Sequence, residues 1–434
     1  GSSMFPSTPI LAMSDTLANT GALGADPTRL LEPHAARMRA TRTDLPTTAR
    51  AVLQLLAHLA HGTLELHLPG ARLHRVGTGS EPRVAMHLHD WSTFADVLAR
   101  GDIGLAEAWI RGAWDTPDLP GLLALFNRNR QALEAVVYGT WWGSLLHRLR
   151  HALNRNNRRG SRRNIHAHYD LGNAFYARWL DETMNYSSAW FDGNRDQTLA
   201  QAQHAKVARA LGEARVGAGT RLLEIGCGWG AVAEAAARAG AQVTGVTLST
   251  EQLHWARERL SAQGLAQRAE LRLQDYRDID DGPFDAIVSI EMFEAVGQAY
   301  WPVFFDTVRR RLAPGGHACL QTITIRDDLF DRYARSTDFI QQYIFPGGLL
   351  PSDERLRAAA TAAGLRVERA LAFGPDYAET LRRWRRVFME QAAEMAGLGF
   401  DARFVRTWDF YLAYCEAAFD TGTTDVVQYT LSKS

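Results

Sequence analysis

A glycine-rich turn behind a short apolar run is the feature that most constrains the fold of this chain. Residues 221–225 have the composition of a buried strand, and Glu224, Gly226, Gly228 and Gly230 form an E-x-G-x-G-x-G pattern before an alanine-rich stretch that predicts a helix. Glycines at a strand-to-helix turn let the backbone approach a ligand closely, and the start of the helix presents oriented N–H groups. The turn therefore predicts a Rossmann-like unit that binds a ligand at this point.

Strands and helices alternate from residue 220 onward. Apolar runs predict five strands, at 221–225, 242–246, 269–273, 284–290 and 317–323. This alternation is typical of an α/β fold with a doubly wound, largely parallel sheet. The C-terminal part predicts two helices and a short final strand, at 377–395, 404–419 and 426–431.

The ends of two predicted strands indicate which ligand the turn binds. The strand that ends near 246 continues into Thr247 and Leu248, with no acidic residue at its tip to hold a nicotinamide ribose. The next strand ends in Gln274 and Asp275, which could hold an adenine by its amino group. We therefore predict S-adenosylmethionine as the cofactor, in preference to NAD.

Composition predicts a folded protein of more than one domain. The chain has 434 residues, of which 46% are hydrophobic and 22% charged, as in ordinary globular proteins. Three scattered cysteines are too few for a disulfide framework or a zinc site, so we expect no metal and a reducing, cytoplasmic location. The 48 basic and 48 acidic residues balance, which gives no support for nucleic-acid binding. No segment has the pattern of a secretion signal or a membrane-spanning helix.

The sequence divides into four predicted parts. They are a mobile N-terminal segment at 1–47, a smaller α+β domain at 48–147, an arginine-rich linker at 148–165 and the main α/β domain at 166–434. Within the smaller domain, alternation of apolar and polar residues at 64–68 and 84–88 indicates two half-buried strands with a glycine-rich turn between them. Helices are expected at 91–100 and 119–129.

An aromatic, apolar segment runs directly into a cluster of arginines. Trp141 and Trp142 lie in that segment, and no acidic residue occurs between 135 and 165. The cluster includes Arg158, Arg159, Arg162 and Arg163. Rings at headgroup depth and guanidinium groups on lipid phosphates are what a peripheral membrane contact requires. We therefore expect the smaller domain to engage lipid at the inner face of a membrane. The alternative is a core-packed helix followed by a solvated linker.

Beyond the glycine turn, a series of motifs resembles one family in its order along the chain. The chain resembles the cyclopropane fatty acid synthases and their mycolic acid relatives, which are S-adenosylmethionine-dependent enzymes with a class I methyltransferase domain. The motifs that carry the resemblance are at 101–109, 168–173, 184–189, 223–230, 273–278, 292–297, 343–348 and 373–377.

The resemblance implies a reaction and a cofactor site. It implies a C-methyltransferase that acts, through a carbocation, on the double bond of unsaturated acyl chains in membrane phospholipids, with a cyclopropane as the expected product. It also implies that a homodimer could form. The residues implied to line the S-adenosylmethionine site are Tyr186, Ser187, Gly226, Gly228, Thr247, Leu248, Gln252, Gln274 and Asp275, with Glu224 close by.

The resemblance also implies a base site, and there this chain departs from its family. The family uses a bicarbonate ion as the base, and the positions that match its ligands are Ser188, Glu294, Gln321, Ile323 and Tyr377. Ser188 stands in place of a cysteine and Gln321 in place of a histidine, although a hydroxyl and an amide can both donate to an anion. Bicarbonate is therefore one candidate base. Glu291 or Glu294 is another, if burial raises its pKa.

Proton loss decides the product of such a reaction. Loss from the transferred methyl group closes a cyclopropane, whereas loss from an adjacent chain carbon leaves a methyl-branched or methylene-bearing chain. Aromatic faces can stabilise the cation, and the candidates are Trp190, Tyr343, Phe345 and Tyr377. Methylation of a small soluble metabolite, and lipid binding by a vestigial methyltransferase domain, are the competing functions.

Overall fold

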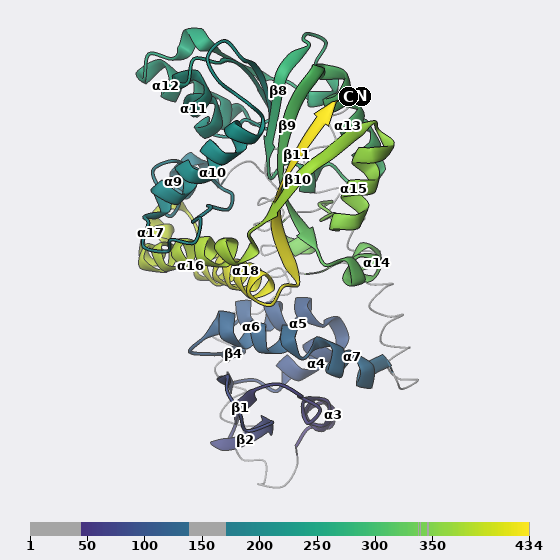
Figure 1. Cartoon of the computed structure of the whole chain (residues 1–434). Coiled ribbons are helices and arrows are strands. Elements are labelled where there is room, and N and C mark those ends of the chain that lie inside the picture. The colour runs from purple at the N-terminus through teal and green to yellow at the C-terminus, as the bar shows by residue number, and fades with distance from the viewer. Residues whose placement is uncertain (1–44, 139–170, 337, 339, 345–346, 434) are drawn as a thin grey trace.

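The computed structural model describes residues 45–138, 171–336, 338, 340–344 and 347–433 (Figure 1). The predicted N-terminal segment up to residue 44 and the predicted arginine-rich linker lie outside the described residues. The same holds for Trp141, Trp142 and Phe345, and for the expected boundary near 147.

Among the described residues, the N-terminal unit contains a four-stranded sheet and five helices. The sheet order is β2-β1-β3-β4, with strands β1 (Thr63–Leu68), β2 (Arg72–Gly77), β3 (Arg83–Leu88) and β4 (Trp114–Asp115). The helices are α3 (Thr47–Leu56), α4 (Ser92–Arg100), α5 (Asp102–Ile110), α6 (Leu119–Arg128) and α7 (Arg130–Tyr138). The two expected strands are confirmed, but a further strand, β2, lies where only a turn was expected. Val76 alone is buried in β2, so that strand carries no apolar alternation.

The main sheet has seven strands in the order β10-β11-β9-β8-β5-β6-β7. Their bounds are β5 (Arg221–Ile225), β6 (Gln242–Thr247), β7 (Ala269–Leu273), β8 (Phe284–Ile290), β9 (Leu312–Ile325), β10 (Leu365–Ala372) and β11 (Thr424–Lys433). Strands β5 to β9 are parallel, and β11 pairs antiparallel with both β9 and β10. The prediction of a doubly wound, largely parallel sheet is therefore confirmed.

Helices cover both faces of this sheet (Figure 1). One face packs against α10 (Leu199–Glu213), α11 (Ala231–Arg238) and α12 (Thr250–Ala262), which share a core of small and branched residues with β5, β6 and β7. The other face packs against α13 (Trp301–Arg311) and α15 (Asp353–Ala362), where the core is aromatic and includes Phe304 and Phe305. Parallel strands buried on both faces account for the continuous apolar runs in the sequence.

Two long C-terminal helices connect the sheet to the N-terminal unit. Helices α16 (Gly374–Glu390) and α18 (Ala402–Asp420) pack against each other, and α18 lies on α5 and α6 (Figure 1). At this contact the Arg406 guanidinium lies 3.9 Å from the centre of the Trp109 ring and donates to the Trp109 carbonyl oxygen. The indole of Trp109 donates to the Arg406 carbonyl oxygen in return. The remaining helices are α9 (Gly172–Ala177), α14 (Phe330–Arg335) and α17 (Ala392–Met395).

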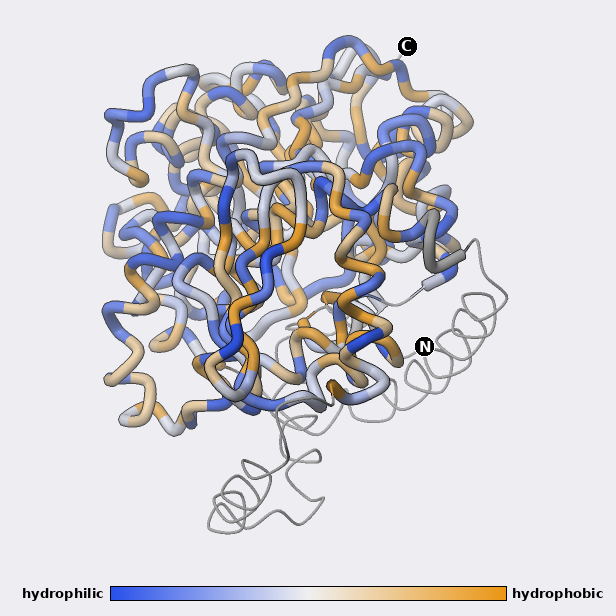
Figure 2. The backbone as a smooth tube through the Cα atoms, turned by 90° about the horizontal axis from the view of Figure 1, so that it is seen from below, coloured by the Kyte–Doolittle hydropathy of each residue, from blue (hydrophilic) through white to orange (hydrophobic). Residues whose placement is uncertain are grey.

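Hydrophilic and hydrophobic residues alternate over short distances along the backbone (Figure 2). Among the described residues, no helix combines the length and the apolar character needed to cross a bilayer.

Candidate active site

A cavity of about 400 Å³ opens beside the ends of β5, β6 and β8 and extends toward α16 and α18. It is lined by most of the residues that the sequence predicts for the site. Of the predicted cofactor residues it brings together Tyr186, Ser187, Glu224, Gly226, Gly228, Thr247, Leu248, Gln252 and Gln274. Of the predicted catalytic residues it is lined by Glu291, Glu294, Ile323 and Tyr377.

The glycine-rich turn has the backbone geometry that its sequence predicts. Gly228 has φ +51° and Gly230 has φ +94°, a region that side chains disfavour. A Cβ atom at Gly228 would meet no described atom within 4 Å, whereas one at Gly230 would lie 3.0 Å from Cβ of Ala256 on α12. Gly228 therefore leaves room beside the cavity, and Gly230 lets α11 and α12 approach each other.

Glu224 supplies an acceptor that has no partner within the described residues. Its side chain is 2% exposed, its Oε1 atom accepts no hydrogen bond, and burial raises its pKa to about 8. A cationic ligand with an amino group, such as S-adenosylmethionine, would provide both the missing donor and a compensating charge. The turn and Glu224 thus fit this cofactor.

Asp275 is the one predicted cofactor residue that does not line the cavity. Its carboxylate accepts from the backbone N–H of Arg277 and from the Arg277 guanidinium, at 3.0 Å (Nε) and 2.6 Å (Nη2), and that ion pair keeps its pKa low. Gln274 does line the cavity and donates to the Asp278 carbonyl oxygen. A contact between Asp275 and adenine stays a prediction.

Glu291 lies at the centre of a buried hydrogen-bond network. Its Oε2 accepts from the Ser188 backbone N–H at 2.8 Å and from Nε2 of Gln321 at 2.7 Å, and its Oε1 accepts from the Tyr377 hydroxyl. The Lys206 ammonium donates to the Ser188 carbonyl oxygen at 3.0 Å and to Oγ of Ser187 at 2.6 Å. Burial raises the pKa of Glu291, while Lys206 and the three donors oppose that rise.

A second carboxyl group, Glu294, differs from Glu291 in its partners. Its Oε1 accepts from the Thr322 hydroxyl at 2.7 Å and from the Ile323 backbone N–H at 2.5 Å, whereas its Oε2 has no partner among the described residues. Burial, and the neighbouring charge of Glu291, raise the pKa of Glu294 to about 8. Burial therefore favours the protonated form of Glu294 at neutral pH.

The side-chain amide of Gln428 holds Gln321 in a single orientation. Nε2 of Gln428 donates to Oε1 of Gln321 at 2.9 Å, and these residues face each other across the β9–β11 ladder. The Arg209 guanidinium donates to Oε1 of Gln428 at 2.7 Å. Oε1 of Gln428 thus accepts from Arg209, and Oε1 of Gln321 accepts from Gln428. The amide hydrogens of Gln321 must therefore point toward Glu291.

Sequence reasoning missed three residues of this site: Lys206, Tyr411 and Gln428. Lys206 is one of only two lysines in the chain and is completely buried, and burial lowers its pKa to about 8. The rarity of lysine in this arginine-rich chain was a signal that could have identified it. Tyr411 lines the cavity, and its hydroxyl lies 2.6 Å from that of Tyr186. Nothing in the sequence pattern connects Tyr411 or Gln428 with the glycine turn.

The predicted cation-stabilising aromatics separate in the structure. Tyr377 lines the cavity and stacks on Phe419, with ring centres 4.4 Å apart. Tyr343 instead donates to Glu107 of α5, and Trp190 packs beneath the Arg209 guanidinium. Neither Tyr343 nor Trp190 lines the cavity.

Comparison with known proteins identifies the family. Residues 156–429 match the family described as mycolic acid cyclopropane synthetase. The chain belongs to this family. It is 40% identical to the tuberculostearic acid methyltransferase of Mycobacterium tuberculosis over 377 residues, which cover 84% of this chain and 88% of the relative. It is 34% identical to the cyclopropane-fatty-acyl-phospholipid synthase of Escherichia coli K12 over 343 residues, which cover 78% and 85%.

A solved structure supports membership of the mycolic acid cyclopropane synthetase family. A mycolic acid cyclopropane synthase complexed with SAH and CTAB superposes with a TM-score of 0.57 at 34% identity, and covers 62% of this chain and 96% of its own. The main sheet and its helices thus form a class I, Rossmann-like methyltransferase fold, and a smaller N-terminal α+β unit precedes them in the chain. This family member is an S-adenosylmethionine-dependent methyltransferase.

Bicarbonate does not fit the base site of this family member as the described residues are arranged. The predicted donors already have acceptors, since Gln321 and Tyr377 donate to Glu291, and Ile323 donates to Glu294. The Ser188 hydroxyl donates to the Ala189 carbonyl oxygen at 2.8 Å. The Glu291 carboxylate thus occupies two of the donors that a bound anion would need, the Gln321 amide and the Tyr377 hydroxyl.

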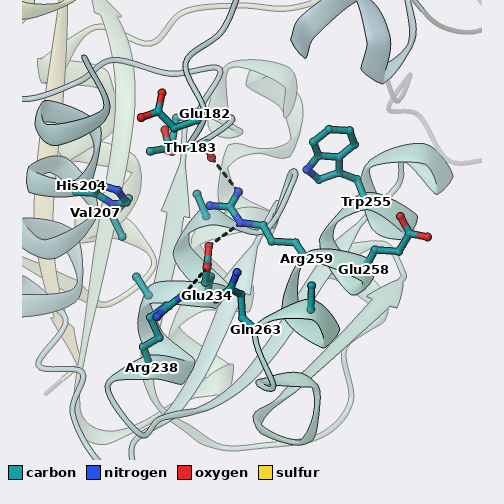
Figure 3. Close-up of a pocket in the computed structure, with 14 residues that line it drawn as sticks. Glu182, Thr183, His204, Val207, Glu234, Arg238, Trp255, Glu258, Arg259 and Gln263 are labelled. Atoms are coloured by element: carbon teal, nitrogen blue, oxygen red, sulfur yellow. Dashed lines mark hydrogen bonds and ion pairs between the residues drawn. The ribbon is translucent and has the colours of Figure 1, made fainter. Parts of the chain in front are cut away.

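A second, larger cavity of about 720 Å³ lies between α11, α12 and the loop at 182–185 (Figure 3). Figure 3 shows the Arg259 guanidinium between Glu234 and the Thr183 carbonyl oxygen, with Arg238 on the other side of Glu234. Glu234 thus forms ion pairs with both arginines. None of the predicted site residues is among the described residues that line this cavity.

Proposed function

We propose that this enzyme transfers a methyl group from S-adenosylmethionine to a double bond within an unsaturated acyl chain of a phospholipid. The observation that carries the proposal is a single cavity that joins the glycine turn to an apolar, aromatic wall and to two buried carboxyl groups. Such a wall suits a hydrocarbon chain. It provides no strong nucleophile, and the reaction needs none from the protein because the alkene itself attacks the methyl group. The names of the two relatives above support an acyl substrate.

The reaction assigns roles to particular side chains. When bound, S-adenosylmethionine supplies an electrophilic methyl group. The alkene's π electrons form the new C–C bond as the S–CH3 bond breaks, and positive charge develops on the neighbouring carbon. The faces of Tyr186 and Tyr377 can stabilise that charge. The buried cavity excludes water that would otherwise trap the cation.

Of the two products, we propose the methyl-branched or methylene-bearing chain. Similarity to the tuberculostearic acid methyltransferase supports this choice, because that relative makes a methyl-branched acid and the similarity covers 84% of this chain. The sequence alone had favoured a cyclopropane. Cyclopropane formation remains the second candidate, because the Escherichia coli relative, similar over 78% of the chain, is named for that reaction.

Mass spectrometry of acyl chains tests the proposal. The protein is incubated with S-adenosylmethionine and vesicles of an unsaturated phospholipid, and the acyl chains are analysed with and without mild bromination. We expect a gain of one CH2 unit and a product that still reacts with bromine. The same mass gain without reaction would establish a cyclopropane instead. Activity on soluble acceptors alone would exclude a lipid substrate.

A further inference from the structure

Glu291 has a backbone conformation that glycine prefers. Its φ is +50°, immediately after β8. For a residue with a side chain, this backbone conformation costs of the order of 1–3 kcal/mol of folding free energy. It persists only where surrounding contacts hold the residue in place. Here the contacts belong to the side chain itself, because Ser188, Gln321 and Tyr377 all donate to its carboxylate. The strain thus accompanies a carboxylate held in one position at the cavity wall.

The partners of Glu291 favour its ionised form. Three described groups donate to its carboxylate, and they and the Lys206 charge oppose the rise in its pKa that burial causes. An ionised carboxylate offers about four lone-pair sites. Two donors use Oε2 and one uses Oε1, which leaves one site of Oε1 available beside the cavity.

Glu294 has fewer groups that stabilise a negative charge. Two donors reach its Oε1, none of the described residues donates to its Oε2, and burial and the charge of Glu291 raise its pKa to about 8. Of the two carboxyl groups, Glu291 is therefore the one better held as a carboxylate that can accept a proton.

We propose that the Glu291 carboxylate is the base that completes methyl transfer, and that this enzyme uses no bicarbonate for the step. The inference rests on the proposed function. The proton of an adjacent C–H bond passes to Oε1 of Glu291, and the C–H electron pair forms the new C=C bond and quenches the cation. Glu291 then releases the proton to solvent as the product leaves.

The first test uses the unmodified enzyme. Turnover on unsaturated phospholipid vesicles is measured in buffer stripped of carbon dioxide, and again after addition of bicarbonate. We expect the same rate in both. A rate that falls to background without bicarbonate and returns with it would overturn the proposal.

The second test removes the carboxylate in two ways. Glu291→Gly suits the positive φ and leaves a space lined by three donors, whereas Glu291→Gln keeps that space filled. We expect both variants to lose at least about 100-fold in rate, and formate or bicarbonate to restore part of the rate only in Glu291→Gly. A wild-type rate in Glu291→Gly would exclude Glu291 as the base, and so would a failure of both anions to restore activity.

Calorimetric titration with S-adenosylmethionine shows whether each variant is folded and binds its cofactor. Glu416→Gln is the matched control, because Glu416 is also buried but lies on α18 beside Arg382 and does not line the cavity. We expect it to keep its rate. A wild-type protein that methylates no lipid overturns the proposed function, while an active wild type with an equally active Glu291→Gly overturns only the base.

Discussion

At the residue scale, the site distinguishes two carboxyl groups by their partners. Three donors reach Glu291 on both of its oxygens, whereas two donors reach Oε1 of Glu294 and none of the described residues reaches its Oε2. The sequence identified both residues as candidates. It did not divide their roles, because hydrogen-bond partners such as Tyr377 and Gln321 lie 86 and 30 positions away from Glu291 along the chain.

Ionisation of Glu294 should destabilise the fold at alkaline pH. Burial raises its pKa from 4.5 to about 8, so the stability that this proton contributes is complete below 4.5 and is lost as the pH rises through about 8. At about 1.4 kcal/mol per pKa unit, the loss is a few kcal/mol. We expect urea unfolding to show that Glu294→Gln becomes more stable relative to wild type between about pH 5.5 and about pH 9. An identical difference at both values would contradict this.

Gln428 should affect catalysis only through Gln321. Gln428→Met removes the donor that fixes the Gln321 amide, so we expect kcat to fall about tenfold while the Kd for S-adenosylmethionine stays unchanged. The exposed Gln242→Met serves as the control. In a double-mutant cycle with Gln321→Met, the two effects should not add. Additive effects would show that Gln428 acts by another route.

At the element scale, the most deeply buried strands were the easiest to predict. Strands β5 and β8 are mainly apolar runs, so their sequence identifies them, and β6 and β7 were predicted as well. Strand β10 was missed because most of its residues are partly or fully exposed and no alternation remains. The same reason explains β2 in the N-terminal unit.

Gly228 and Gly230, two of the three glycines of the turn, should respond differently to the same substitution. Both have positive φ, so alanine costs each about 1–2 kcal/mol. In Gly230→Ala the new Cβ also meets Ala256, so we expect a further loss of thermal stability. In Gly228→Ala the Cβ adds bulk beside the cavity, so we expect cofactor affinity to fall at least about tenfold. Thermal unfolding and calorimetry measure the two effects. Equal changes in both variants would contradict this division.

At the scale of the whole molecule, the cavity depends on parts of the chain that are far apart in sequence. It is lined by residues from Tyr176 to Thr424, and α18, which lies on the N-terminal helices, supplies one wall. Sequence pattern located the cofactor half of this site, because that half follows one strand and its turn. The base half needs β9, β11 and α16 together, and no local pattern predicts such an assembly.

The arginine cluster remains a prediction about membranes. Replacing Arg158, Arg159, Arg162 and Arg163 with Gln should weaken binding to anionic vesicles at least about tenfold, since each such residue contributes about 1 kcal/mol near a charged surface. Affinity for S-adenosylmethionine should not change. Cosedimentation with vesicles measures the first quantity and calorimetry the second. Unchanged vesicle binding would favour a solvated linker.

The position of β11 has a consequence for how the protein is made. This strand, at Thr424–Lys433, lies between β9 and β10 and carries Gln428. A ribosome synthesises residues 424–433 after every other strand of the sheet. The edges of β9 and β10 that pair with β11 therefore stay unpaired until those residues emerge. Until then, Gln321 also lacks the amide that orients it. The nascent enzyme can therefore form its cofactor turn early, but it becomes competent for catalysis only when translation of this domain is nearly finished.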